Sequence, residues 1–403
     1  MKIVQINAVH AVRSTGRQVT ELSRYLEKFG HDNIIIYSSG KKIKNGYKIG
    51  STIDSKIHAL LSRFFGLQAY YSKHATRKMI KYLKSYKPDL VHLNNLHANF
   101  INLKIILQYL SEYDIPTVIT LHDCWFYTGK CTHYTQDECS RWQIKCGNCP
   151  RLKKDNKSWF FDRTTKMLLD KHNWFSKIPR LGVVGVSKWI TNEVSNSILK
   201  NSNIITTIYN WIDLNLFKHI DNNEIRDRYL IHRKFVILGV ASEWTSNKGL
   251  EKFIELSNHL KEDETIILLG NIKSKADFVS KIINIPETNE ILDLVKIYSM
   301  SDVFINLSKE ESFGKTTAEA LSCGLPVITN SFTANPELIN AKCGLILENL
   351  NVETVLKAIK LVKQNGKSYY SLNSRMQAEK NFLYEDRAQD YLDLYKRLID
   401  GGE

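Results

Sequence analysis

The sequence predicts an α/β protein made of two doubly wound parallel-sheet domains. Its 403 residues exceed one ordinary domain, and short apolar runs alternate with segments of helical periodicity through both halves. Alternation of this kind is typical of parallel sheets that are covered by helices on both faces. In such folds, ligands bind in the crevice at the carboxyl ends of the strands.

Strand-length apolar runs occur in both halves of the chain. They cover residues 2–6, 33–37, 89–93, 116–121 and 181–186 in the first half, and 203–209, 234–240, 265–270, 302–307 and 325–330 in the second. Strand periodicity ends near residue 209, where the charge balance also changes sign. We therefore predict domains over residues 1–208 and 209–385, followed by a closing helix over 386–403.

The net charge of +14 is unevenly distributed along the chain. Residues 1–200 carry 32 basic and 14 acidic side chains, whereas residues 201–403 carry 24 and 28. Residues 56–87, which begin at Lys56, contain many basic and aromatic side chains and no Asp or Glu. This stretch fits an anionic membrane surface, and it equally fits a core-facing helix whose basic face is solvated.

Neither a membrane span nor a signal peptide is expected. No uninterrupted apolar run approaches the roughly 18 residues that a span needs. Gln5, Asn7 and His10 interrupt the apolar start of the chain, which is better explained as a buried first strand. We expect a cytoplasmic protein that associates peripherally with the cytoplasmic face of the membrane.

The segment from residue 302 to 326 is the most informative for function. A strand is followed by a turn over residues 311–314 and by a helix that begins at Lys315. A helix N-terminus at the carboxyl edge of a sheet binds phosphate groups. Glu311 and Glu319, eight positions apart, suit the sugar and ribose hydroxyls of a sugar nucleotide. The alternative is that both are solvated acids near a helix start.

Three further residues are predicted at carboxyl edges. Lys248 lies at a helix start after a strand and suits the charge of a diphosphate leaving group. Gly16 is predicted in the turn between the first strand and its helix, and His122 ends the strand over residues 116–121. The sequence contains no Asp-x-Asp pair after a strand, so no catalytic metal is expected at the phosphates.

Four cysteines in a loop over residues 124–150 have spacing that suggests a metal site. They are Cys131, Cys139, Cys146 and Cys149. The last pair resembles half of a zinc ribbon, although the first pair is spread more widely than usual. A structural Zn ion that pins this loop is favoured over free buried thiols and over an iron–sulfur cluster.

At this point the sequence resembles the GT-B retaining glycosyltransferases of family 4, group 1. Residues 311–319 match that family's E-x7-E motif, and residues 324–328, 333–339 and 343–347 match the segments that follow it. Residues 85–97, 121–131 and 182–190 are similar to the colanic-acid or capsular-polysaccharide subgroup. The resemblance implies that two Rossmann-like domains face a central cleft.

The resemblance also implies roles for individual residues. Glu319 would bind ribose, Glu311 the transferred sugar and Lys248 the diphosphate, while His122 would contact the sugar near the acceptor. Gly16 would let the first domain approach the donor, and donor contacts would come from Phe313, Gly314, Lys315 and Thr316. One departure concerns Glu243, which stands where the family usually has an Arg; Arg13, Arg17 or Lys315 would supply the missing cation.

The sequence thus predicts a glycosyltransferase that uses a nucleotide-sugar donor and a lipid-linked glycan acceptor at an anionic inner-membrane surface. It would need no catalytic metal and bind no nucleic acid. Two alternatives stay open: a zinc-containing nucleic-acid-binding protein, and a non-catalytic subunit that binds sugar nucleotides. The first leaves the Glu311 and Glu319 pair without a purpose.

Overall fold

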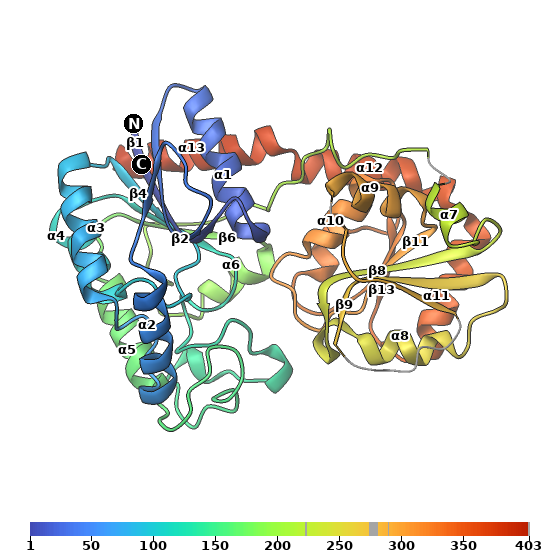
Figure 1. Cartoon of the computed structure of the whole chain (residues 1–403), viewed down its shortest axis with the longest axis horizontal. Helices are drawn as coiled ribbons and strands as arrows, with labels where there is room; N and C mark the ends of the chain where they lie inside the picture. Colours follow the sequence, from blue (N-terminus) through green and yellow to red (C-terminus); the bar gives the residue numbers. More distant parts are fainter. Residues whose placement is uncertain (222–223, 274–280, 289, 402–403) are drawn as a thin grey trace. The chain divides into compact units, whose positions relative to one another are not determined.

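The computed structural model of the chain divides into two compact units (Figure 1). Unit 1 comprises Met1–Tyr209 with Glu385–Glu403, and unit 2 comprises Asn210–Tyr384. The structure describes residues 1–221, 224–273, 281–288 and 290–401. Among the helices in these ranges, none combines the length and the apolar character needed to cross a membrane.

Unit 1 is built on a parallel sheet of seven strands in the order β3-β2-β1-β4-β5-β6-β7. The strands are β1 (Lys2–His10), β2 (Asp32–Gly40), β3 (Gly46–Lys48), β4 (Leu90–Leu93), β5 (Thr117–Leu121), β6 (Leu181–Gly185) and β7 (Ile204–Thr207). The helices are α1 (Arg13–Lys28), α2 (Thr52–Phe65), α3 (Lys73–Tyr86), α4 (Leu103–Glu112), α5 (Thr164–Phe175), α6 (Lys188–Val194) and α13 (Tyr384–Ile399).

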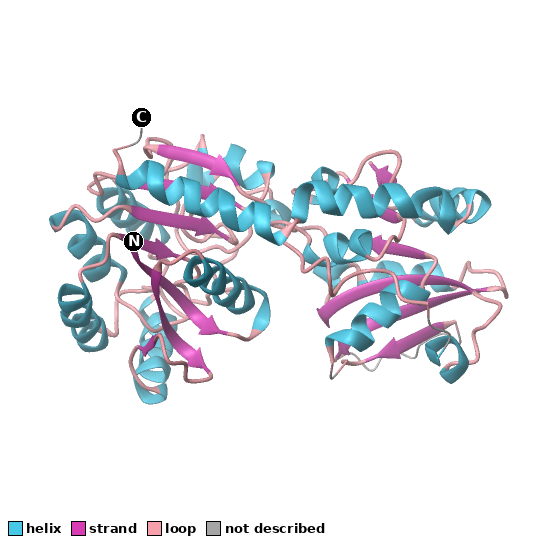
Figure 2. Cartoon of the chain, turned by 90° about the horizontal axis from the view of Figure 1, so that it is seen from above, coloured by secondary structure: helices cyan, strands magenta, loops and turns pink. Residues whose placement is uncertain are grey.

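Unit 2 is likewise built on a parallel sheet, with six strands in the order β10-β9-β8-β11-β12-β13. Figure 2 shows strands in magenta with helices in cyan beside them. The strands are β8 (Phe235–Trp244), β9 (Glu264–Ile272), β10 (Ile282–Ile285), β11 (Val303–Asn306), β12 (Val327–Asn330) and β13 (Gly344–Leu347). The helices are α7 (Glu224–Arg228), α8 (Leu250–Ser257), α9 (Ile291–Met300), α10 (Lys315–Ser322), α11 (Val352–Asn365) and α12 (Lys367–Phe382). The two sheets confirm the predicted fold class.

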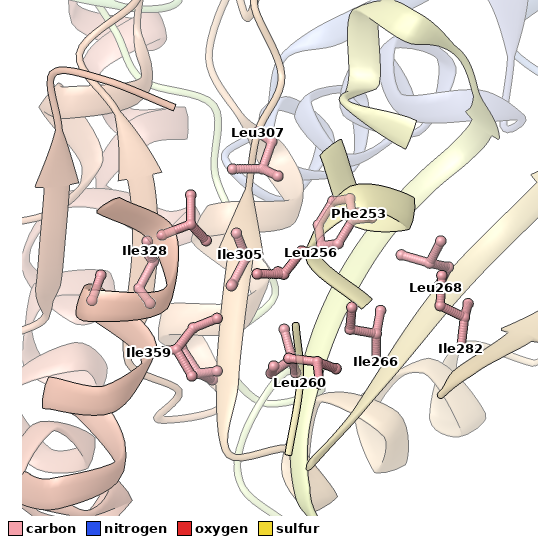
Figure 3. Close-up of a cluster of buried hydrophobic side chains, with 14 of the residues drawn as sticks. Phe253, Leu256, Leu260, Ile266, Leu268, Ile282, Ile305, Leu307, Ile328 and Ile359 are labelled. Atoms are coloured by element: carbon pink, nitrogen blue, oxygen red, sulfur yellow. The ribbon is translucent and has the colours of Figure 1, made fainter. Parts of the chain in front are cut away.

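The strands of unit 2 share one apolar core with the helices that cover them. Figure 3 shows Ile266, Ile305 and Ile328 from the sheet together with Phe253 of α8 and Ile359 of α11. These side chains are almost completely removed from solvent. Because burial of each such side chain favours folding by roughly 1.5–3 kcal/mol, this core holds the helices against the sheet.

β7 pairs with β6 at the edge of the first sheet, although residues 203–209 stand in the second half of the chain. One expectation about local structure was wrong. Gly16 does not lie in a turn, since α1 begins at Arg13 and includes it. A Cβ atom on Gly16 would lie 3.1 Å from Val9 Cγ2, so its small size lets the first turn of α1 pack closely on β1.

Residues 56–87 form two helices with different surroundings. α3 buries Ala75, Thr76, Met79 and Leu83, which agrees with the core-facing alternative. α2 instead buries His58 and Ser62, while several of its apolar side chains are exposed.

Buried hydrogen bonds attach α13 to the sheet of unit 1. His92 on β4 contacts Thr120 on β5 through Nε2 (2.7 Å), and its Nδ1 contacts the hydroxyl of Tyr395 (2.7 Å). Tyr391 also reaches Thr120, at 3.0 Å. Burial lowers the pKa of His92 to about 3, so the imidazole is neutral near pH 7 and can accept one hydrogen bond while donating another.

We expect the Tyr395→Phe substitution to destabilise unit 1 by about 1–3 kcal/mol, because it leaves the buried Nδ1 of His92 without its partner. Urea unfolding of unit 1 measures the change in its free energy of unfolding. Tyr369→Phe, at an exposed position of α12, is the matched control and should change the free energy of unfolding little. Equal stability of the Tyr395 variant and the wild type would contradict this account of α13.

Candidate functional site

The order of strands in unit 2 brings two loops together at the carboxyl edge of its sheet. The strand order reverses between β8 and β11, which are direct neighbours. Residues 245–249 follow β8, and residues 307–314 follow β11. The backbone N–H of Lys309 donates to the carbonyl of Asn247 at 3.0 Å. Reversals of this kind are where doubly wound sheets bind ligands.

Lys248 and Glu311 form an ion pair between these two loops. Lys248 Nζ lies 2.5 Å from Glu311 Oε1 and 3.4 Å from Ser308 Oγ. Gly249 makes the approach of the loops possible, because its φ is +80° and a Cβ atom there would lie 2.7 Å from Leu307 Cβ. Both charged side chains are only partly buried. A polar ligand can therefore reach them, and either side chain can leave the ion pair to bind it.

The N-terminus of α10 opens at the same edge. Gly314 caps the helix with φ +90°, a conformation that glycine adopts without strain. Lys315 and Thr316 are the first two helical residues, and backbone N–H groups at such positions have no acceptor inside the helix. Phe313 is buried and packs edge-on against Phe382, with ring centroids 5.4 Å apart. This packing holds the start of α10 in place.

Glu319 lies on the second turn of α10 and is 8% exposed. Its Oε2 accepts a hydrogen bond from the hydroxyl of Tyr298 on α9 at 3.0 Å. Burial, followed by the nearby Glu319 carboxylate, holds the pKa of Tyr298 well above its usual range. The tyrosine therefore stays a neutral donor that orients the Glu319 carboxylate.

Three buried asparagines support the edge from beneath. Asn306 at the end of β11 donates to Asn335 Oδ1 (3.1 Å), and Asn335 donates to Asn330 Oδ1 (2.9 Å) at the end of β12. Asn330 and Asn335 both donate to the carbonyl of Ser308, at 2.9 and 3.1 Å. Because this network links β11, β12 and the loop after β11, it fixes the backbone that carries Glu311.

Thr333 is a further part of the support for Glu311. Its hydroxyl accepts the Glu311 N–H at 3.0 Å, and the neighbouring Ala334 N–H donates to the Glu311 carbonyl at 3.3 Å. Thr333 has φ +52°, which is unusual for a β-branched residue. Strained backbone of this kind is concentrated at binding sites.

In unit 1, polar groups also gather where the strand order reverses, between β1 and β4. His122 follows β5, and its Nε2 lies 3.0 Å from Oδ1 of Asn94, which follows β4. Burial lowers the pKa of His122 to about 4, while the nearby Asp123 acts in the opposite direction. Within the described part of the chain, the buried Asn94 Nδ2 and Asn95 Oδ1 have no hydrogen-bond partner. This edge therefore has spare capacity to bind a polar ligand.

His97 and Asp123 form a second pair beside His122. His97 Nε2 lies 2.9 Å from Asp123 Oδ2, and the Trp125 N–H donates to Asp123 Oδ1 at 2.9 Å. Although burial acts to raise the pKa of Asp123, His97 and these hydrogen bonds lower it overall. The Asp123 carboxylate thus fixes the backbone that follows His122, because it binds both His97 and the Trp125 N–H.

The four predicted metal ligands, Cys131, Cys139, Cys146 and Cys149, line one small pocket of unit 1. A hydrogen bond from Cys131 lowers the pKa of the Cys149 thiol to about 7. In the described ranges, however, no group of three or more His, Cys, Asp or Glu side chains is arranged to hold a metal ion. No Zn site is evident in this arrangement.

Two buried lysines hold the loop that carries these cysteines. Lys130 Nζ donates to the carbonyls of Arg151 (2.8 Å) and Lys154 (2.9 Å), and Lys171 Nζ donates to those of Trp125 (2.5 Å) and Thr128 (3.0 Å). The loop is thus held by hydrogen bonds from these lysines to its backbone, and also by the packing of its buried rings, among them Tyr127 and Trp142.

The position that departs from the family pattern is occupied by an ion pair. Glu243 Oε1 lies 2.7 Å from Lys273 Nζ, and both side chains are largely exposed. Of the cations proposed as substitutes for the missing Arg, Lys315 belongs to unit 2, at the start of α10. Arg13 and Arg17 belong to α1 of unit 1.

Sequence reasoning missed several residues that position the site. Tyr298, Asn306, Asn330 and Asn335 were not singled out, and neither was Asn94. A signal was present for some of them, because Asn306 and Asn330 are polar residues at the ends of otherwise apolar strands. Tyr298 offered none, since an aromatic residue in an amphipathic helix usually only packs.

The comparison with protein families agrees with this geometry. Residues 15–216 match the family described as Glycosyltransferase Family 4, and residues 221–381 match Glycosyl transferases group 1. Two parallel-sheet units of this kind form the GT-B fold, which solved glycosyltransferase structures share. The chain belongs to glycosyltransferase family 4, group 1. It is an enzyme that transfers sugar from a nucleotide sugar, and this family generally works without a metal.

Individual relatives are distant. The chain is 21% identical over 339 residues to the putative colanic acid biosynthesis glycosyl transferase WcaC of Escherichia coli K12, covering 77% of each chain. It is 22% identical to the capsular polysaccharide biosynthesis glycosyltransferase CapM of Staphylococcus aureus, covering 55% of this chain and 63% of that protein.

Among solved structures, a glycosyltransferase from Rickettsia africae superposes with a TM-score of 0.70 at 18% identity and 99% coverage of both chains. Anabaena HepE in complex with UDP-glucose gives a TM-score of 0.65 at 14% identity, covering 98% of this chain and 99% of that one. These likenesses show the fold.

We expect Asn335→Ala to destabilise unit 2 by roughly 2–4 kcal/mol, since several buried groups lose their partner together. Urea unfolding measures this change. Asn258→Ala, at an exposed position after α8, is the control. An Asn335 variant that is as stable as the control would show that the network does not hold the edge.

Proposed function

We propose that this protein is a retaining glycosyltransferase that moves a sugar from a nucleotide-sugar donor to a lipid-linked saccharide in cell-surface polysaccharide biosynthesis. The observation that carries the proposal is the Lys248–Glu311 ion pair, which lies beside the start of α10 where the strand order of unit 2 reverses. A cation, a helix N-terminus and a carboxylate at one edge match a diphosphate that is linked to a sugar.

Each donor-side residue has a chemical task in this proposal. Backbone N–H groups at Gly314, Lys315 and Thr316 bind diphosphate oxygens, and Lys248 neutralises the charge that develops as the diphosphate leaves. Glu319, held by Tyr298, accepts hydrogen bonds from the ribose hydroxyls. Once Lys248 turns to the diphosphate, Glu311 is free to bind hydroxyls of the transferred sugar. Phe313 contributes its backbone N–H beside that sugar.

Unit 1 supplies the acceptor side. A neutral His122 that donates from Nε2 to Asn94 keeps Nδ1 as a hydrogen-bond acceptor for a sugar hydroxyl. The spare groups of Asn94 and Asn95 suit further hydroxyls. Gly16 gives α1 its close packing on β1, which places the start of that helix beside this edge.

The transfer step needs no covalent enzyme intermediate. The acceptor oxygen forms a bond to the anomeric carbon on the face from which the diphosphate departs, and the bond between that carbon and the phosphate oxygen breaks. The acceptor proton passes to the leaving phosphate. Lys248 and the α10 N-terminus stabilise the negative charge in place of a catalytic metal.

The acceptor and location are proposed from charge and from relatives. WcaC and CapM are named for colanic acid and capsular polysaccharide biosynthesis. The excess of basic side chains in residues 1–200 suits an anionic membrane that carries the lipid-linked acceptor. We therefore propose peripheral binding to the cytoplasmic face of the inner membrane, with no role for nucleic acid.

We expect Glu319→Gln to weaken donor binding by roughly tenfold or more, because an uncharged amide accepts weaker hydrogen bonds from ribose than a carboxylate does. Thermal shift with a panel of UDP-, GDP- and dTDP-sugars identifies the donor, and titration calorimetry then measures the affinity. Glu348→Gln, an exposed Glu of the same unit, is the control. Unchanged donor binding and transfer by the Glu319 variant would remove the proposed ribose contact.

We also propose that the Cys-rich loop binds a structural Zn ion through Cys131, Cys139, Cys146 and Cys149. The support is that the four side chains line one pocket. Four thiolates are a usual ligand set for a structural Zn ion.

Metal analysis of protein purified under reducing conditions should give about one Zn per chain. Cys149→Ser should lose the metal and lower the melting temperature, whereas Cys343→Ser, which lies in unit 2, should keep it. Substoichiometric Zn together with four freely alkylated thiols would overturn this proposal without affecting the donor site.

A further inference from the structure

α2 presents an apolar stripe to solvent and buries polar residues. The exposed side chains are Ile53, Ile57, Leu60 and Phe64, which follow one another at helical spacing. Ile53 is 70% exposed, whereas His58 and Ser62 on the opposite face are 1% and 7% exposed. An ordinary surface helix of a soluble protein shows the reverse arrangement. We therefore expect a binding partner to bury the exposed apolar stripe.

A second element extends this stripe. Residues 159–161 expose Trp159, Phe160 and Phe161, and Phe160 is 63% exposed. Phe64 of α2 contacts Phe160 edge-on, with ring centroids 5.0 Å apart, and lies 6.5 Å from the ring of Phe161. The two elements thus form one surface, which we call the α2–159 surface.

The backbone holds the two elements together. The Trp159 N–H donates to the carbonyl of Arg63 at 2.7 Å. α2 ends at Gly66, whose φ is +69°, and a Cβ atom there would lie only 2.2 Å from the Phe161 carbonyl oxygen. Glycine therefore permits the close approach, and the aromatic side chains keep their outward positions.

Exposed cations accompany the apolar side chains. Residues 52–65 and 153–163, which form and flank this surface, carry six exposed basic side chains: Lys56, Arg63, Lys153, Lys154, Lys157 and Arg163. Lys154 is paired with Asp137 at 2.9 Å. The same residues carry three acids, Asp54, Asp155 and Asp162, of which Asp155 pairs with Arg151. Basic side chains therefore outnumber acids by six to three, and the net charge around the surface is positive.

We propose that the α2–159 surface inserts into the headgroup region of an anionic lipid bilayer. An apolar stripe with aromatic ends and cations matches the chemistry of a membrane interface, where rings meet acyl chains and cations meet lipid phosphates. The inference rests on the proposed function, because a lipid-linked acceptor has to be met at a bilayer. It adds the side chains that enter the lipid.

Vesicle binding tests the proposal. The protein should sediment with vesicles of equal phosphatidylglycerol and phosphatidylcholine, and should bind pure phosphatidylcholine vesicles at least tenfold more weakly. Among the tryptophans that the structure describes, Trp159 alone is exposed, while Trp174 and Trp189 are half-buried. Its fluorescence should shift to the blue on binding and be quenched by brominated acyl chains, and Trp159→Phe should remove that response.

Substitutions separate insertion from general charge attraction. Phe64→Ser combined with Phe160→Ser should weaken binding to anionic vesicles by roughly tenfold or more, since each ring then loses its apolar burial. Leu372→Ser, at a 69% exposed position of α12 in unit 2, is the matched control and should bind as the wild type does. Leu60→Ser tests the same stripe independently, in case the double variant does not fold.

The possible outcomes are distinct. Equal vesicle binding by the double variant, or no fluorescence response from Trp159, would overturn the proposal. A dimer of the wild type in light scattering that the double variant abolishes would also overturn it, because a second copy would then cover the surface. Donor binding, measured on the same variants, should remain unchanged. Lost donor binding in Glu319→Gln tests the proposed function separately.

Discussion

The topology of the two parallel sheets is the constraint on which the rest of this structure depends. Parallel strands end at one edge, and the loops of neighbouring strands meet where the order of connection reverses. In unit 2 this reversal lies between β8 and β11, so that Lys248 and Glu311 approach to 2.5 Å although 63 positions separate them. The ion pair, the helix cap at Gly314 and Glu319 all derive their places from this one arrangement.

Both edges are stabilised by buried polar side chains rather than by apolar packing alone. In unit 2, Asn306, Asn330 and Asn335 satisfy one another and the carbonyl of Ser308. In unit 1, Asn94 meets His122 and retains a buried amide group without a partner in the described residues. The asparagine network of unit 2, whose members bond one another, provides a rigid support for the donor site. The unpaired amide group in unit 1 is suited to a ligand that carries hydroxyls.

The surface of unit 1 combines charge and apolar character in a way that composition alone did not show. Its excess of basic residues gives long-range attraction to an anionic surface, which salt weakens. α2 and residues 159–161 add an apolar contact that acts only at short range. Attraction followed by insertion would hold a lipid-linked acceptor near an enzyme whose donor is dissolved in water.

The sequence by itself determined the features that depend on neighbouring residues. Apolar runs predicted both sheets, and residues 311–319 predicted a turn followed by a helix that begins at Lys315, as α10 does. Tertiary structure decided the rest, because packing partners distant in the chain set it. The contact between His92 and Tyr395 spans 303 positions, and the first turn of α1 took in Gly16 by packing on β1. Likewise, only the folded chain showed that α2 turns its isoleucines outward, since periodicity reveals an apolar face but not what that face meets.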